Sequence, residues 1–231
     1  MGTLISDKYA AWEQECTERF NKLKANEEEL NRIFIDIYGL QDELTPEVED
    51  KDVTVRKADL QREIKSLISY AVGCWFGRYS LDVKGLAYAG GEWDSTKYKT
   101  IIPVKDNVLP ICDDDYLPTD LTGLIVDFVA KAYGEDTLDE NLKFIADALG
   151  GKGTPREVIR SYLLNGFYAD HCKIYQKGRF TGFSAPAKRT VSRRLCICTA
   201  GSVPPLRPSA PTTFTSCRNA TAHSFPCFLS R

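Results

Sequence analysis

Histidine is scarce in this sequence, and long apolar runs are absent. The 231 residues include only two histidines, His171 and His223, so catalysis that uses histidine as an acid, a base or a triad member has few candidates. No stretch of about eighteen apolar residues is present, and residues 1–16 show no signal-peptide core. We therefore expect a soluble, cytoplasmic protein without a membrane partner.

The common catalytic and nucleotide-binding motifs are absent as well. The sequence contains no GxSxG, HExxH, GxGxxG or Walker phosphate loop. The run GGKGT at 150–154 lacks the spacing of a phosphate loop, which favours the end of one helix followed by the start of the next. Cysteines and histidines from His171 onward lack the paired spacing of a zinc site. We expect no catalytic, cofactor-binding or metal-binding residue in this chain.

Charge is distributed unevenly along the chain, although the formal net charge is only −2. Residues 178–231 hold eight of the 30 basic residues and no acidic ones, so residues 1–177 hold the other 22 together with all 32 acidic residues, a net charge of −10. Affinity for nucleic acid comes largely from neutralised phosphates. This acidic body argues against a self-sufficient, non-specific DNA binder. It is compatible with a body that shapes a site while a neighbouring domain supplies positive charge.

The pattern centres on one stretch, LQREIKSLISYAVGCWFGRYSL at 60–81. Its apolar residues recur every three or four positions, which predicts a central and largely buried helix. Gly73 and Gly77 lie four apart and predict a helix side where another backbone comes close. Basic residues crowd the start of the helix. They are either the solvated first turn of an ordinary core helix or a basic end that faces a polyanion.

Other segments also show helical periodicity. Ser6 or Asp7 is expected to cap a long helix that ends near Tyr38, either unbroken or kinked at Ala25-Asn26. Three shorter helices are expected in the second half of the chain, at 121–133, 138–149 and 155–163. The last two have the spacing of capping boxes, Thr137 with Glu140 and Thr154 with Glu157.

The segments between these helices are short or irregular. Residues 41–52 form an acidic, solvated connector, and residues 82–94 form a glycine-rich, aromatic loop that either carries recognition or covers the core. Proline interrupts two extended segments, 100–104 and 108–111, which predicts edge strands or non-sheet strands. The expected fold class is mainly α with short β segments.

The composition changes abruptly after Lys177. Six of the 11 prolines and four of the eight cysteines lie in residues 178–231, without a sustained period, so we expect a disordered tail. Codons can be chosen for Arg179–Leu195 such that reading two bases onward gives VYWLFSSGKENGFKAL, an amphipathic sequence with a glycine turn. We therefore expect this tail to be out of frame.

Three long runs and one short run carry a family resemblance. They are NEEELNRIFIDIYGLQDELTPE at 26–47, VRKADLQREIKSLISYAVGCWFGRYSLDVKGLAYAGGEWD at 55–94, FIADALGGKGTPREVIRSYL at 144–163 and HCKIYQK at 171–177. In this order they resemble the C-terminal half of PglX-type adenine-specific DNA methyltransferases of BREX phage-defence loci, which are similar to fused type II restriction–methylation enzymes. In that family HCKIYQK is followed by a segment like the one that the shifted frame encodes.

The resemblance implies transfer of a methyl group from S-adenosylmethionine to adenine N6 in double-stranded DNA, with the target base flipped into a pocket that carries an Asn-Pro-Pro-Tyr motif. This chain has neither that motif nor the cofactor-binding sheet, so no catalytic or cofactor residue is carried over. We expect a fragment of a larger multidomain enzyme, inactive alone, that contributes DNA recognition or domain docking. Its expected units are a helical segment at 1–40, a helical, target-recognition-like region at 41–177 and the tail at 178–231.

The DNA-contact candidates are seven basic residues, namely Arg56, Lys57, Arg62, Lys65, Arg78, Lys97 and Lys99. The expected partners are double-stranded DNA, the missing catalytic half and other phage-defence proteins. Two alternatives stay open. One is a protein-interaction module that binds a partner through its first helix and its Gly73/Gly77 face. The other is a decayed product without a function.

Overall fold

The computed structural model describes residues 2–90, 92–113, 119–174, 182–184 and 192–196. Over these residues it contains six α-helices, two short 3-10 helices and three short strands, which confirms a mainly α fold with short β segments. The α-helices are α1 (Ile5–Tyr38), α2 (Leu60–Trp75), α3 (Leu121–Tyr133), α4 (Leu138–Leu149), α5 (Pro155–Asn165) and α6 (Phe167–Ile174). In the same part of the chain, no helix is both long and apolar enough to cross a membrane.

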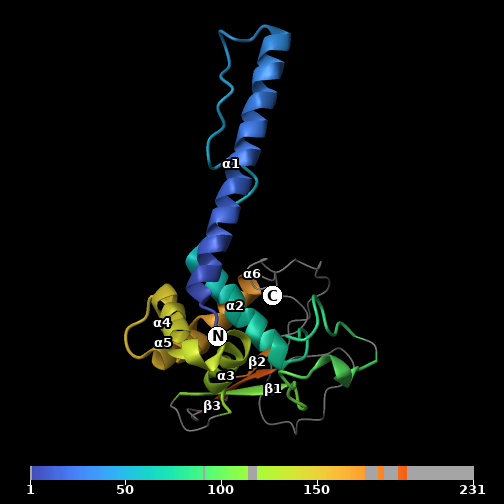
Figure 1. Ribbon diagram of the computed structural model, residues 1–231, viewed down its shortest axis with the longest axis vertical. Coiled ribbons are helices and arrows are strands. Elements are labelled where there is room, and N and C mark those ends of the chain that lie inside the picture. The colour runs from blue at the N-terminus through green and yellow to red at the C-terminus, as the bar shows by residue number, and fades with distance from the viewer. Residues whose placement is uncertain (1, 91, 114–118, 175–181, 185–191, 197–231) are drawn as a thin grey trace.

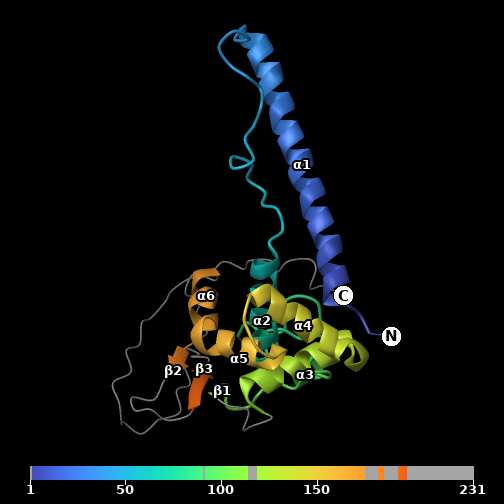
Figure 2. The ribbon, with the colours of Figure 1, turned by 90° about the vertical axis from the view of Figure 1, so that its left-hand side faces the viewer.

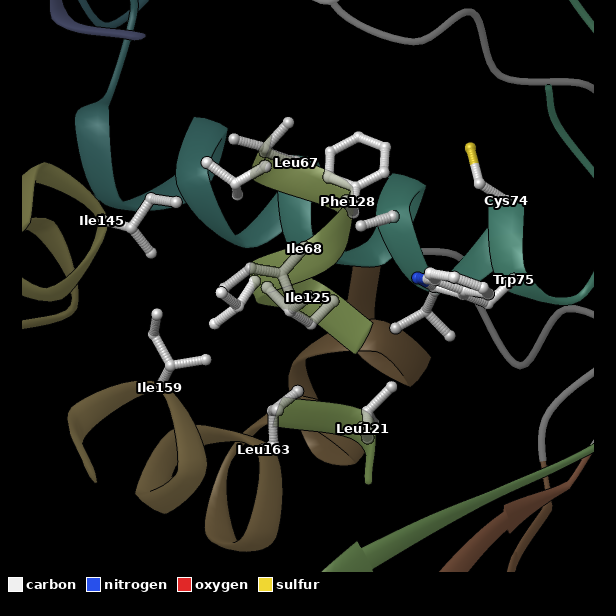
Figure 3. Close-up of a cluster of buried hydrophobic side chains, with 14 of the residues drawn as sticks. Leu67, Ile68, Cys74, Trp75, Leu121, Ile125, Phe128, Ile145, Ile159 and Leu163 are labelled. Atoms are coloured by element: carbon white, nitrogen blue, oxygen red, sulfur yellow. The ribbon is translucent and has the colours of Figure 1, made fainter. Parts of the chain in front are cut away.

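Helix α2 is the centre of the helical body, in contact with α3, α4 and α6. Ten of its sixteen residues are buried, which confirms the predicted central, largely buried helix. Figure 3 shows Leu67 and Ile68 of α2 facing Ile125 and Phe128 of α3, with Ile145 of α4 beside them. Burial of such side chains contributes about 1.5–3 kcal/mol each. The buried face of α2 is therefore an apolar surface on which α3 and α4 pack.

Helix α2 ends at Trp75, earlier than the sequence pattern predicted. Gly77 has φ +74°, and its N–H donates to Cys74 O, while Arg78 N–H donates to Gly73 O at 2.8 Å. These two hydrogen bonds form a Schellman motif, which stops the helix. The expected close approach of a second backbone at Gly73 and Gly77 is wrong. The space beside Gly73 is filled by the ring of Tyr79 instead.

Helix α1 begins at Ile5, and neither Ser6 nor Asp7 caps it. The N-cap is Leu4, whose side chain makes no capping hydrogen bond. Asn141 of α4 caps the helix instead, although it is far away in the sequence. Its Oδ1 accepts a hydrogen bond from Ile5 N at 2.8 Å. The helix then runs unbroken for 34 residues, about 50 Å. It ends before Gly39, whose φ of +67° is the left-handed conformation of a glycine C-cap.

The upper half of α1 projects from the body, and the chain returns alongside it (Figures 1 and 2). We call residues 20–58 the arm. Three contacts hold its two sides together: Lys24 Nζ to Asp50 Oδ1 at 2.8 Å, Asn31 Nδ2 to Pro46 O at 3.2 Å, and Val48 N to Glu28 Oε1 at 3.3 Å. The returning connector therefore covers one face of the helix with polar contacts.

The two predicted capping boxes have different outcomes. At the start of α5, Thr154 accepts from Glu157 N and Glu157 Oε2 accepts from Thr154 N, so this box is confirmed. At the start of α4, the Thr137 side chain makes no capping hydrogen bond. A 3-10 turn at Glu135–Thr137 precedes α4 and turns the hydroxyl toward Tyr133 O. The capping box predicted at Thr137 and Glu140 is therefore wrong.

The strands form one small antiparallel sheet in the order β1-β3-β2. Strand β1 (Val108–Cys112) is an edge strand, as expected, whereas residues 100–104 form no strand. Strands β2 (Gly182–Ser184) and β3 (Ser192–Cys196) lie within the tail at 178–231. Most of that tail lies outside the described residues, so its disorder and its shifted frame stay predictions.

Candidate nucleic-acid interface

The loop between α2 and β1, residues 78–107, gathers aromatic and basic side chains, and Asp82 holds it together. The Asp82 carboxylate accepts hydrogen bonds from Thr100 Oγ1 at 2.6 Å, Thr100 N at 2.9 Å and Lys99 N at 2.8 Å. These bonds, chiefly the one from the Thr100 hydroxyl, lower the pKa of Asp82 to about 2. The Asp82 carboxylate therefore joins the start of the loop to Lys99 and Thr100 near its end.

A second set of bonds brings both ends of the loop together. Ser80 Oγ donates to Lys97 O at 2.6 Å. Ala87 N donates to Arg78 O at 3.0 Å, and Lys97 Nζ donates to Ala87 O at 3.3 Å. Arg78 and Lys97 thus contact the same short piece of backbone, although they are nineteen positions apart. The fold therefore brings the backbone of Arg78 and the side chain of Lys97 together at Ala87.

Three aromatic rings form a cluster in the same loop. Tyr98 is buried and its hydroxyl donates to Gly77 O, which fixes its ring at the end of α2. Trp93 stacks on Tyr98 with ring centroids 4.7 Å apart and only 5° between the planes. Tyr88 meets Trp93 edge to face at 5.2 Å. Trp93 itself is 50% exposed, so part of the cluster faces solvent.

The basic candidates at the start of α2 are largely neutralised by acidic neighbours. Lys57 Nζ lies 2.9 Å from Asp50 Oδ2, and Arg62 Nη2 lies 2.7 Å from Oε1 of the buried Glu63. Arg56 is exposed and lines a shallow groove of about 310 Å³ beside α1. Two of these three cations form ion pairs within the chain. The start of α2 therefore offers little positive charge to a polyanion.

The remaining candidates separate into a second group. Lys65 pairs with Asp170 at 2.7 Å and lies over the ring of Tyr162. Arg78, Lys97 and Lys99 belong to the loop that follows the other end of α2, a helix of 16 residues and about 24 Å. The seven residues therefore do not form one basic patch. Their roles as DNA contacts stay predictions, and the loop group is the better placed of the two.

Sequence reasoning identified the loop but not the residue at its centre. Trp93 was part of the aromatic run at 82–94, without a role of its own. Two contacts position the Trp93 ring. It stacks on Tyr98, and it lies so close to Gly77 that a Cβ at that position would be 2.6 Å from the ring. The density of aromatics in a glycine-rich loop was the signal that pointed here.

His171, the histidine in the described part of the chain, has the environment of a packing residue. Its Nδ1 lies 3.3 Å from Ser69 Oγ, and its ring lies 5.5 Å from that of Phe167. Burial, together with the positive charge of Arg78, lowers the pKa of His171 to about 4. The described residues also contain no group of three His, Cys, Asp or Glu side chains arranged to hold a metal ion.

Comparison with known proteins places the chain in a family. No family model matches it. It is 55% identical over 194 residues to the adenine-specific methyltransferase PglX of Lacticaseibacillus casei (strain Zhang), a match that covers 78% of this chain and 16% of that protein. It is 33% identical over 202 residues to the adenine-specific methyltransferase BrxX of Escherichia coli O9:H4 (strain HS), with 75% and 17% covered. The chain therefore belongs to the PglX-type adenine-specific methyltransferases and spans about one sixth of the length of these relatives.

Proposed function

We propose that this chain supplies DNA contacts to an S-adenosylmethionine-dependent, adenine-specific DNA methyltransferase of a BREX-type phage-defence system, and that it transfers no methyl group by itself. The observation that carries the proposal is the 55% identity to an adenine-specific methyltransferase over most of the chain. The matched chain has no Asn-Pro-Pro-Tyr motif and no Gly-rich cofactor loop. Recognition rather than catalysis is the role that its residues support.

The loop at 78–107 is the surface that we assign to DNA. It contains five basic residues against four acidic ones, whereas residues 1–177 as a whole carry a net charge of −10. The loop therefore carries a net charge of +1 on an acidic body, so phosphates are repelled less there than over residues 1–177 as a whole.

Trp93 adds a contact that does not depend on charge. Stacking of an unpaired base on an aromatic side chain is worth about 1–3 kcal/mol. Trp93 stacks on Tyr98, meets Tyr88 edge to face and is still 50% exposed. Lys99 is exposed one residue beyond Tyr98 and lies within the same loop. The pair offers one ring and one cation to a DNA strand.

The test is a fluorescence-anisotropy titration of a labelled DNA duplex that carries one unpaired base with the purified chain at several salt concentrations. We expect weak binding with a log–log salt slope of about −2 to −3, which corresponds to two or three phosphate contacts. Trp93→Ala should weaken binding about tenfold at every salt concentration. Lys99→Ala should reduce the slope by about one.

Lys152→Ala is the matched control, since Lys152 is exposed in the turn between α4 and α5 and should leave both affinity and slope unchanged. Absence of binding at about 50 mM salt, or equal effects of all three substitutions, would contradict the assignment. A parallel assay with radiolabelled S-adenosylmethionine and duplex DNA should show no methyl transfer by the chain alone. Transfer above background would overturn the second half of the proposal.

A further inference from the structure

Helix α1 presents two different faces in the arm, and the connector covers only one of them. The covered face consists of Phe20, Lys24, Glu28, Asn31 and Ile35, which follow one another at intervals of three or four residues. Phe20 lies under the Lys57 ammonium at 4.4 Å, and Ile35 is only 8% exposed. The three residues between them make the polar contacts to the connector described above. This face is complete within the chain.

The other face is bare. Leu30, Ile33, Phe34 and Ile37 share it, and they are 54%, 45%, 55% and 68% exposed. We call these four residues the tip stripe. Tyr38, 70% exposed, stacks on Phe34 and extends the stripe to the end of the helix. Single exposed apolar residues are ordinary, but a contiguous row of large ones marks an interaction surface.

The surroundings of the tip stripe are strongly acidic. Residues 26–52 contain ten Asp or Glu and two Lys or Arg, a net charge of −8. Both of those basic residues are paired locally, Arg32 with Glu29 and Lys51 with Glu49. A second copy of the chain would bring two such tips together at a cost in repulsion, and DNA would be repelled outright. The charge selects a partner with basic residues.

We propose that the tip stripe docks an amphipathic helix with basic flanks, contributed by the part of the methyltransferase that this chain does not span. The matched relatives are about six times longer than the segment that they share with this chain, so most of each polypeptide is available to cover the arm. An apolar row of four residues on a helix is the form of surface that another helix packs against. The inference rests on the proposed function only in taking the rest of the methyltransferase as the source of that helix.

The first test uses the chain as it is and a synthetic amphipathic peptide of about three heptads, with leucine on one face and lysine on its flanks. We expect this peptide to bind at least about tenfold more tightly than a sister peptide with glutamate flanks. The double variant Ile33→Ser/Ile37→Ser should lose the binding. Both residues are exposed, so the variant should keep the circular dichroism spectrum of the parent. Equal binding of the two peptides, or binding that survives the double substitution, would overturn the proposal.

The second test identifies the source of the partner. The matched segment of the Lacticaseibacillus casei PglX is replaced by this chain's sequence, and a photo-crosslinking amino acid is placed at Phe34 or, as a control, at Arg32 on another side of α1. We expect crosslinks from position 34, and not from position 32, to peptides outside the exchanged segment. Crosslinks between two arms, or none from position 34, would show that the proposal is wrong. DNA binding by the double variant should be unchanged, so a failed loop assignment and a failed arm assignment are distinguishable.

Discussion

Arg160 of α5 forms a buried ion pair with Asp120, the N-cap of α3, with 3.1 Å between Nη2 and Oδ2. The other oxygen of Asp120 accepts from Gly123 N at 2.8 Å, so one carboxylate both caps a helix and joins it to its neighbour. Asp120 is fully buried and Arg160 is 7% exposed. Removing one partner of such a pair leaves an uncompensated buried charge.

Asp120→Ala should therefore destabilise the protein by about 3–5 kcal/mol, measured by urea unfolding followed by circular dichroism. Asp127→Ala is the control, because its pair with Lys131 is an exposed ion pair one turn apart on the same helix and should contribute less than about 0.5 kcal/mol. Similar losses in the free energy of unfolding of the two variants would show that burial does not make the Asp120–Arg160 pair more stabilising than an exposed ion pair.

Gly77→Ala should cost about 2 kcal/mol and disturb the aromatic cluster. The residue needs φ +74°, and an added Cβ would also meet the Trp93 ring at 2.6 Å. Gly85→Ala is the control, since Gly85 has φ +81° but open space around it, and should cost only about 1 kcal/mol. Tryptophan fluorescence should shift in the Gly77 variant and not in the Gly85 variant. An unchanged spectrum in both would contradict the close contact between Gly77 and Trp93.

Stability should fall when pH is lowered through the range in which His171 titrates. The pKa of His171 is about 4 in the folded chain, below its ordinary value of 6.5, so between these values the unfolded chain binds more protons than the folded one. The stabilisation is complete above pH 6.5 and decreases toward pH 4, by up to about 3 kcal/mol. In His171→Asn this part of the pH dependence should disappear. His223 is present in both proteins, so a difference between their profiles reports on His171.

Glu157→Ala should lower stability by about 0.5–1 kcal/mol, because its carboxylate accepts from Thr154 N at 2.8 Å and completes the capping box of α5. Glu140→Ala, at the matching position of α4, should change stability by less than about 0.5 kcal/mol, since no capping box forms there. Thermal unfolding of the two variants measures the difference. Equal destabilisation would mean that the α4 box forms in solution.

The gene that encodes the tail offers a test without protein. The relatives match 78% and 75% of this chain. Residues 1–177 are 177 of its 231 residues, which is a similar share. We predict that the DNA after the codon for Lys177, translated two bases onward, continues as protein-like sequence that resembles the same relatives. Stop codons close to that point in the alternate frame would refute the frameshift.

Local chemistry was enough to predict most of the helices. The capping box at Thr154, the left-handed Gly150 between α4 and α5, and Gly39 at the end of α1 all act over a few residues, so the sequence contains the whole interaction. The buried face of α2 followed from its period, because the 3.6-residue repeat places its apolar side chains on one side. The family resemblance rested on long matching runs and was confirmed by comparison with two relatives.

Contacts between distant residues decided the rest. The cap of α1 comes from Asn141, 136 positions away from Ile5, and the charge of Lys65 is paired with Asp170 on α6. A sequence shows the charge of a lysine but not the carboxylate that will lie beside it, so it could not tell which basic residues are free. It also could not show that the connector covers one face of α1 and leaves Phe34 exposed, because that depends on how a returning segment packs against the helix.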